Sequence, residues 1–253
     1  MDRALNVTAS TNSGIAFNNT DTVNRSLTIS GTNPFTIGTG ANLTVSTISA
    51  NTAQDNLINI TRSITGAGSM IVEGFNNINS TTTNFGRGRV AMNNISPLLW
   101  TGALDIRKGT AEIYGAPATL DDFTGNISLG ETGNAFGAGL LISPNANANL
   151  TFANAITVRS GGYRTIRSVV DPYSPGGDTF HTLSGPITLD GNLGLFINAN
   201  NPDRRLIVSG NISGVGSLEL TKGYANGFFR LQGNNSNWSG NLTISKGNRR
   251  YSR

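Results

Sequence analysis

Short alternations of apolar and polar residues run along most of the chain, and the 3.6-residue period of an amphipathic helix is almost absent. A typical element is an apolar-x-apolar pair flanked by Gly, Asn or Ser, such as Phe35 with Ile37 or Leu43 with Val45. A period of two places both apolar side chains on the same face of a strand. The pattern therefore predicts an all-β fold built from many short strands.

The same pairs recur to the far end of the chain, with turn-forming residues between them. They are Leu27 with Ile29, Ile127 with Leu129, Leu150 with Phe152, Ile156 with Val158, Ile187 with Leu189, Leu193 with Leu195, and Leu206 with Val208. A β-sandwich has strands of about five or six residues and a core between two sheets. Here most strands carry only two apolar residues and aromatics make up 7% of the chain, which favours a coiled architecture instead.

Two segments, residues 64–113 and 212–247, align as copies of one repeat. Each has a Gly-x-Gly turn, two alternating strands, an Asn-rich turn, a Trp-x-Gly sequence, a third strand and a Lys-Gly pair. The first copy has extra residues between its first two strands, and stacked coils tolerate insertions of that kind. The repeat positions are Gly66, Gly68, Trp100, Gly102 and Gly109 in the first copy, and Gly214, Gly216, Trp238, Gly240 and Gly247 in the second.

This order of turns and strands resembles the autotransporter-associated β-strand repeat, in which an aromatic residue, one other residue and Gly precede the third strand. Both copies have Trp where Tyr or Phe is commoner. The resemblance implies a right-handed parallel β-helix in an exported bacterial surface protein, and it assigns no catalytic activity.

Simple geometry agrees with that expectation. Three short faces of seven or eight residues make a coil of about 20–25 residues, a usual size for a solenoid repeat. The sequence therefore predicts a single β-helix segment over residues 1–253 with about ten coils. Inward residues would form one apolar column, and those expected inside are Met70, Val72, Leu104, Ile106, Leu218, Leu220, Leu242 and Ile244.

Composition narrows the classes of function. Charged residues make up 13% of the chain and Cys is absent, so neither a disulfide framework nor a thiolate metal site is possible. The net charge is +4, but the basic residues are scattered rather than gathered in a stripe, which argues against nucleic-acid binding. No apolar run is long enough for a membrane-spanning helix, and the first residues do not form a signal peptide. An export signal and a membrane anchor are expected outside this sequence.

The candidate chemical groups are few. His181 is the single histidine, and Asp171 and Asp178 lie near it in a loop rich in Pro and Gly. Those two carboxylates are candidate calcium ligands, and the competing interpretation is a loop protruding between coils. Asp121 and Asp122 are adjacent, so on an extended backbone they point to opposite sides and do not form an acid–base pair.

Other candidates have structural explanations. Trp100 and Trp238 could stack on sugars, but their fixed place in the repeat favours a packing role. Lys108 and Lys246 are expected at solvated corners. Asn-x-Ser/Thr triplets are formal glycosylation acceptors, but in a chain rich in these residues Asn at corners is better explained by turn conformation and amide stacking. The triplets include Asn42, Asn59, Asn126, Asn149, Asn211 and Asn241.

The sequence thus predicts a structural or adhesive segment of a cell-surface protein, with no catalytic residues and no cofactor. Its expected partners are flanking coils of the same polypeptide and surface or host glycans or proteins. A carbohydrate-active β-helix, such as a polysaccharide lyase or a glycoside hydrolase, is the alternative. A passive spacer that binds nothing is a third interpretation.

Overall fold

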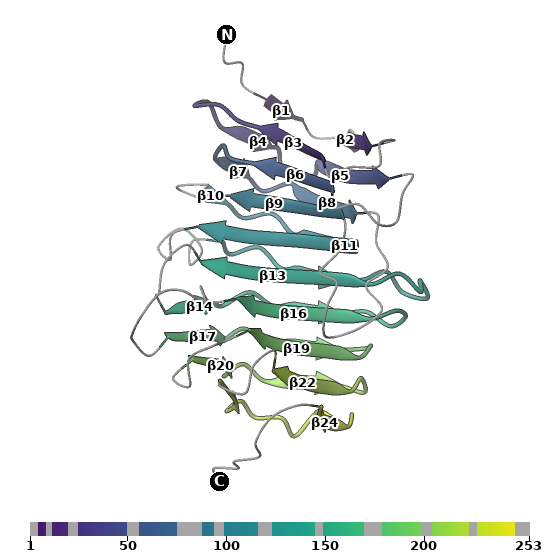
Figure 1. Cartoon of the computed structure of the whole chain (residues 1–253), viewed down its shortest axis with the longest axis vertical. Coiled ribbons are helices and arrows are strands. Elements are labelled where there is room, and N and C mark those ends of the chain that lie inside the picture. Colours follow the sequence, from purple (N-terminus) through teal and green to yellow (C-terminus); the bar gives the residue numbers. More distant parts are fainter. Residues whose placement is uncertain are drawn as a thin grey trace.

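The computed structural model describes residues 5–8, 12–19, 25–49, 56–74, 88–93, 99–115, 123–144, 149–169, 179–198, 204–222 and 227–245. These residues form a parallel β-solenoid whose strands stack along the long axis, with the two chain ends at opposite ends of the stack (Figure 1). Every strand pair among them is parallel, which excludes an antiparallel sandwich. The predicted parallel β-solenoid is confirmed, whereas its right-handed sense stays a prediction.

The described strands stack in three columns, and most coils contribute one strand to each column. The first column contains two four-stranded stacks: β1 (Leu5–Val7), β4 (Phe35–Ile37), β7 (Ile64–Gly66) and β10 (Leu99–Trp100), then β14 (Leu150–Phe152), β17 (Thr179–Leu183), β20 (Arg204–Val208) and β23 (Phe228–Leu231). The second contains β2 (Asn12–Asn19), β5 (Asn42–Ser49), β8 (Ser69–Gly74), the start of β11 (Leu104–Gly115), β12 (Ile127–Leu129), β15 (Ile156–Val158), β18 (Ile187–Leu189) and β21 (Ile212–Gly214). The third contains β3 (Arg25–Ile29), β6 (Asn56–Ile60), β9 (Gly88–Asn93), the end of β11, β13 (Ala138–Pro144), β16 (Arg164–Val169), β19 (Leu193–Asn198), β22 (Leu218–Lys222) and β24 (Leu242–Ile244).

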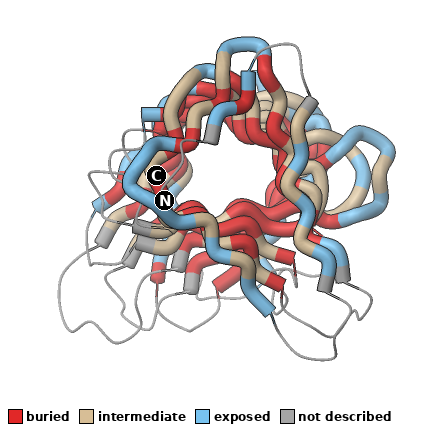
Figure 2. The backbone as a smooth tube through the Cα atoms, turned by 90° about the horizontal axis from the view of Figure 1, so that it is seen from above, coloured by how far each residue is buried: buried red, intermediate tan, exposed pale blue. Residues whose placement is uncertain are grey.

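The apolar pairs identified in the sequence face the inside of the coils. Seen along the axis, buried residues line the interior and exposed residues lie outside and at the ends (Figure 2). One continuous cluster of buried side chains runs from Val7 to Leu220. No single coil can bury its own apolar face, so this core depends on contacts between successive coils.

Six of the eight residues predicted to lie inside are buried: Met70, Val72, Leu104, Ile106, Leu218 and Leu220. The prediction is wrong for Leu242, which is 45% exposed, and for Ile244, which is only partly buried. Both residues belong to β24, which pairs with β22 on one side and with no described strand on the other. Their exposure follows from that open side.

The number of coils is lower than predicted. The third column, the longest, stacks nine strands in the part of the chain that the structure describes, whereas about ten coils were expected. The reason is coil length, because the sequence distance between paired residues ranges from 21 (Arg89 with Thr110) to 35 (Glu73 with Lys108) instead of 20–25. Longer coils leave room for fewer of them in a chain of 253 residues.

The insertion in the first repeat copy leaves the stack intact. It separates β8 from β9, and both strands pair in parallel with β11, with one register shift between Ile106 and Lys108 where β11 pairs with β8. Gly74 at the end of β8 and Gly88 at the start of β9 are in contact, since a Cβ added to Gly74 would lie 2.3 Å from the carbonyl oxygen of Gly88. An excursion can therefore begin and end at one point of the coil without displacing the strands.

The described part of the chain is entirely strand, bridge, turn or irregular structure. Within it, there is no helix long and apolar enough to cross a membrane.

Candidate functional site

The Gly-x-Gly and Trp-x-Gly sequences of each repeat copy stack on one another in successive coils. Trp100 lies beside Gly66 in the parallel pairing of β10 with β7, and Trp238 forms a parallel bridge with Gly214 of β21. In each copy the indole Nε1 donates to the carbonyl oxygen of the second glycine below it, Gly68 or Gly216, at 2.7 Å. The two sequences together form a two-coil corner, which we call the corner unit.

The glycines of the corner unit are required by close backbone approach. Gly66 and Gly214 have φ values of 98° and 99°, which other residues rarely adopt. A Cβ on Gly102 would lie 1.7 Å from the carbonyl oxygen of Gly68, and the equivalent distance from Gly240 to Gly216 is 1.9 Å. Any side chain at these positions would separate the coils.

The two corner units occupy different columns. In the first copy, Gly66 ends a strand of the first column, and the third strand of the repeat is the start of β11 in the second column. In the second copy, Gly214 ends a strand of the second column and β24 belongs to the third. The second copy is therefore displaced by one column relative to the first, yet its local geometry is the same.

A third aromatic-x-Gly sequence covers the first corner unit. The ring of Phe123 stacks on Trp100 with centroids 5.0 Å apart, and a Cβ on Gly125 would lie 1.8 Å from the carbonyl oxygen of Gly102. In the next coil Asn154 replaces glycine, and its amide donates to the carbonyls of Phe123 and Gly125. The sequence analysis missed Phe123 because no Gly-x-Gly turn precedes it, although Phe-Thr-Gly-Asn parallels Trp-Ser-Gly-Asn at Trp238.

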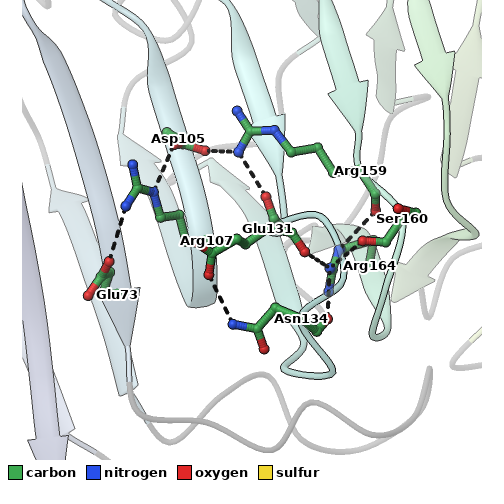
Figure 3. Close-up of polar contacts among 9 residues, drawn as sticks. Glu73, Asp105, Arg107, Glu131, Asn134, Arg159, Ser160 and Arg164 are labelled. Carbon is green, nitrogen blue, oxygen red and sulfur yellow. Dashed lines mark hydrogen bonds and ion pairs between the residues drawn. The ribbon is translucent and has the colours of Figure 1, made fainter.

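Charged residues gather on the outward side of the second column (Figure 3). Asp105 accepts hydrogen bonds from both neighbouring arginines, at Oδ1 from Arg159 Nη1 at 2.6 Å and at Oδ2 from Arg107 Nε at 3.1 Å. Arg107 also lies 3.5 Å from Glu73. Arg159 reaches Asp105 across an intervening coil, and it also donates to the carbonyl oxygen of Gly130 in that coil at 2.9 Å. The guanidinium of Arg164 fills the space that a side chain at Gly130 would need. We call Glu73, Asp105, Arg107 and Arg159 the charged ladder.

The charged ladder is internally neutralised, with two carboxylates and two guanidinium groups. The hydrogen bond to Asp105 raises the pKa of Arg107 above its ordinary value, against the opposing effect of burial. Both carboxylate oxygens of Asp105 are already held by guanidinium groups. These two charge-assisted bonds hold Asp105 in place and stabilise its ionised form, which favours a structural role for this carboxylate.

Arg164 lies beside the charged ladder and is fully buried. Its guanidinium donates to backbone carbonyl oxygens, among them those of Glu131 at 3.1 Å, Ser160 at 3.3 Å and Phe136. Burial lowers the pKa of Arg164, and the nearby charge of Arg159 lowers it further. These bonds fix the corner loop from Glu131 to Phe136, so Arg164 is a structural clamp and not a substrate ligand.

The exposed side chains of the loop that Arg164 holds include Glu131 and Phe136. Glu131 accepts a hydrogen bond from Asn134 at 2.9 Å, and Phe136 is 47% exposed. The ammonium of Lys108 lies 5.8 Å from the centre of the Phe136 ring. Lys108 is thus at a corner, as predicted, but it contacts an aromatic ring there.

His181 is buried among apolar residues. It lies between Leu150 and Leu206 in the first column, and its Nδ1 is 2.5 Å from Ser168 Oγ. The pair superficially resembles a nucleophile and its base, but both side chains are fully buried inside the solenoid. A substrate cannot reach them without opening the coil.

Several candidates from the sequence lie outside the described residues: Asp121, Asp122, Asp171, Asp178, Lys246 and Gly247. Among the residues that are described, no three His, Cys, Asp or Glu side chains are grouped as a metal site requires. Gly109, the remaining repeat glycine, has φ 80° and lies where β11 passes from the second column to the third.

Asparagine side chains join neighbouring coils at the corners. Asn149 Oδ1 accepts from the backbone N–H of Phe180 at 2.8 Å, and Asn211 Oδ1 accepts from that of Asn234 at 2.9 Å. These bonds connect an amide to the backbone of the next coil, whereas the sequence suggested amide-to-amide stacking. They give a structural reason for Asn in two of the formal glycosylation triplets.

No family model matches this chain, and neither a curated protein nor a solved structure shows significant similarity to it.

Proposed function

We propose that this protein is a rigid segment of an exported bacterial surface protein, which spaces other parts of the polypeptide and offers its lateral faces to glycans or proteins. The observation that carries the proposal is the third column, where nine parallel strands stack in register. Each strand pairs only with its neighbours, so the structure extends in one direction. Such an arrangement suits a spacer.

The side chains on the outside support a structural role. The charged ladder links coils to one another, and Asn149 and Asn211 bind the backbone of the following coil. Tyr163 adds a third type of link, since its hydroxyl donates to Glu219 two coils away at 3.4 Å. These outward polar groups stiffen the stack and are not gathered around a site for chemistry.

The resemblance to the autotransporter-associated β-strand repeat supports a surface location. Both corner units have the same Trp hydrogen bond and the same glycine contact, as copies of one repeat should. The absence of cysteine is compatible with passage through an oxidising compartment.

Rigidity can be measured directly because the chain has no native cysteine. Ser26 and Thr243 are exposed at opposite ends of the third column, so Ser26→Cys with Thr243→Cys accepts two spin labels. Eight strand spacings predict one narrow distance on the order of 40 Å. The denatured protein is the control and should give a broad distribution. A broad distribution in the native protein would contradict a rigid spacer.

Location needs a separate test. Protease treatment of intact source cells should remove the segment from the cell surface, and antibodies against it should label those cells without permeabilisation. A cytoplasmic control protein should survive the same treatment. If the segment survives intact and is labelled only after permeabilisation, the surface assignment is wrong.

The alternative, a carbohydrate-active β-helix, would place its chemistry on the charged ladder. There, Asp105 is held by two arginines, which the proposed spacer role explains and catalysis does not. Turnover of any polysaccharide in a panel of pectins, alginates and glycans, abolished by Asp105→Asn but kept by Asp190→Asn, would replace the spacer proposal. Asp190 is the control because it is exposed and follows β18 in the same column.

A further inference from the structure

The two corner units differ in what lies above them. Trp100 is fully buried beneath Phe123, whereas Trp238 is only partly buried at the last described coil. Below each indole the contacts match. The backbone N–H of Thr101 donates to the carbonyl of Gly66 at 3.0 Å, and that of Ser239 donates to the carbonyl of Gly214 at the same distance. The first corner unit thus has another coil above it, whereas the second has the same geometry with no described coil above it.

The last described coil has the properties of an interface. Leu242 is 45% exposed and Phe228 is 39% exposed, while Phe229, Leu231 and Ile244 are partly buried against the core. Among the described residues, β23 pairs only with β20 and β24 only with β22. Within the described part of the chain, the backbone edges of β23 and β24 and the end of the apolar core therefore lie together, continuous with the coil-to-coil interface of the interior.

We propose that the end face formed by Trp238, Gly240 and Leu242 docks one further β-coil, and that this coil carries an aromatic-x-Gly sequence. The contacts above the first corner unit indicate which residues the docked coil needs. An aromatic ring stacks on the indole as Phe123 stacks on Trp100, and an apolar pair continues the column above Leu242. Glycine follows the aromatic residue because a Cβ would meet the Gly240 carbonyl, as at Gly125 over Gly102.

A second copy of this chain is a poorer occupant. Its first coil, β1 to β3, has Phe17 as the aromatic residue of the described strands, and Asn18 and Asn19 follow it. That end has no aromatic-x-Gly sequence to place over Trp238 and Gly240. The inference concerns the end of the stack and does not depend on a surface location.

The test uses the full chain extended after Arg253 by a flexible linker and a second copy of residues 107–144. This segment carries Phe123 and Gly125 with their flanking strands, and it contains no tryptophan. Tethering raises its effective concentration to about the millimolar range. Two matched controls carry Phe123→Ala or Gly125→Ala in the tethered copy only.

The readout is the fluorescence of Trp238, since Trp100 is already fully buried. With the unaltered tether, Trp238 emission shifts to shorter wavelength and acrylamide quenching falls, and both effects are lost with either control tether. A Trp238→Phe change in the chain removes the signal and identifies its source. Equal shielding by all three tethers, or none by the unaltered tether, overturns the proposal.

A second measurement addresses the competing occupant. Light scattering of the unextended chain over a range of concentrations reports self-association. A concentration-dependent doubling of mass that also shields Trp238 would assign the end face to a second copy and overturn the proposal. A constant mass with an accessible Trp238 is the expected result.

Discussion

Trp100 and Trp238 occupy the same local structure, yet one is sealed inside the stack and the other lies at its edge. Both indoles donate to a glycine carbonyl at 2.7 Å, and both corners have a glycine above a glycine. The difference between the two regions is the next coil, which contributes Phe123 in one place and has no described equivalent in the other. The Gly-x-Gly and Trp-x-Gly sequences therefore determine the local geometry of the corner unit, whereas the next coil determines how far its tryptophan is buried.

This comparison separates two contributions to stability. Contacts within a corner unit are present in both copies, so they should be similar in strength. Burial of apolar side chains depends on a coil above and a coil below, so it should be larger in the interior. Substitutions at equivalent positions of the two copies can distinguish these contributions.

The largest expected difference is between Leu104 and Leu242, which are equivalent in the repeat. Leu104 is fully buried and Leu242 is 45% exposed. Leu104→Ala should lower the free energy of unfolding by about 2–5 kcal/mol, as truncation of a buried leucine does. Leu242→Ala should cost less than about 1 kcal/mol, because little apolar surface is lost from the core. Denaturant unfolding measures both, and equal costs would contradict stacking as the source of burial.

Gly102 gives the next largest effect. In Gly102→Ala the new methyl would lie 1.7 Å from the Gly68 carbonyl oxygen, so the coils must separate, at a cost of about 1–3 kcal/mol or more. Gly14→Ala is the matched control, because its Cβ would have 3.6 Å to the nearest atom in an exposed strand. The control should be neutral or slightly stabilising. Thermal unfolding of the two variants tests the requirement for glycine at the corner.

The tryptophan hydrogen bond should give a smaller effect. Trp100→Phe keeps an aromatic ring under Phe123 but leaves the buried Gly68 carbonyl without its indole donor, a loss of about 1–3 kcal/mol. Trp238→Phe removes the same bond at a partly exposed corner, where water can replace the donor, so it should cost under about 1 kcal/mol. Chemical denaturation of the two variants compares them, and a larger cost at Trp238 would contradict the assignment of the end.

The smallest effect concerns pH. Burial raises the pKa of Tyr163 above its ordinary value, and the charge of Glu219 adds to the effect. Since the unfolded chain ionises first, the contribution of neutral Tyr163 to stability is complete below its ordinary pKa of about 10 and is lost as the pH rises above it. Tyr163→Phe should therefore flatten the fall in stability at alkaline pH. Unfolding measured on both sides of that value tests this, and an unchanged slope would contradict it.

Tyr163 also belongs to a set of contacts that reaches the last described coil. Glu219 accepts hydrogen bonds from Tyr163 and from Ser245, which follows β24 in the last described coil. In the variant Glu219→Gln the last coil should exchange its amide hydrogens faster, while the interior around Trp100 should not change. That pattern would follow from neighbour-only coupling.

The sequence was sufficient for the class of fold because period two is a direct consequence of strand geometry. It also identified the corner residues, since glycine is irreplaceable where backbones meet. It could not give the number of coils, because the sequence distance between paired residues varies from 21 to 35, and the pattern of the short strands does not contain that distance. Nor could it place Leu242 correctly, because burial at an end depends on a neighbouring coil and not on the residue.

The outward polar groups were harder to foresee. Arg159 and Asp105 are 54 residues apart, and they meet across an intervening coil in which Arg159 also binds the Gly130 carbonyl. The sequence analysis did not single out Arg164, which is fully buried and donates to several backbone carbonyls. Such contacts depend on register across several coils, which a local pattern does not contain.

The displacement of the second corner unit by one column has a consequence for how such a chain could lengthen. A duplicated gene segment must keep the reading frame. In a solenoid it usually must also encode a whole number of coils, so that the following strands stay in their columns. Here the same motif functions at a corner between the first and second columns and at one between the second and third. Recombination need not insert a whole number of coils. A fragment that displaces the motif by one column still places it at a corner where it can form the same contacts. This tolerance widens the set of crossovers that yield a foldable product.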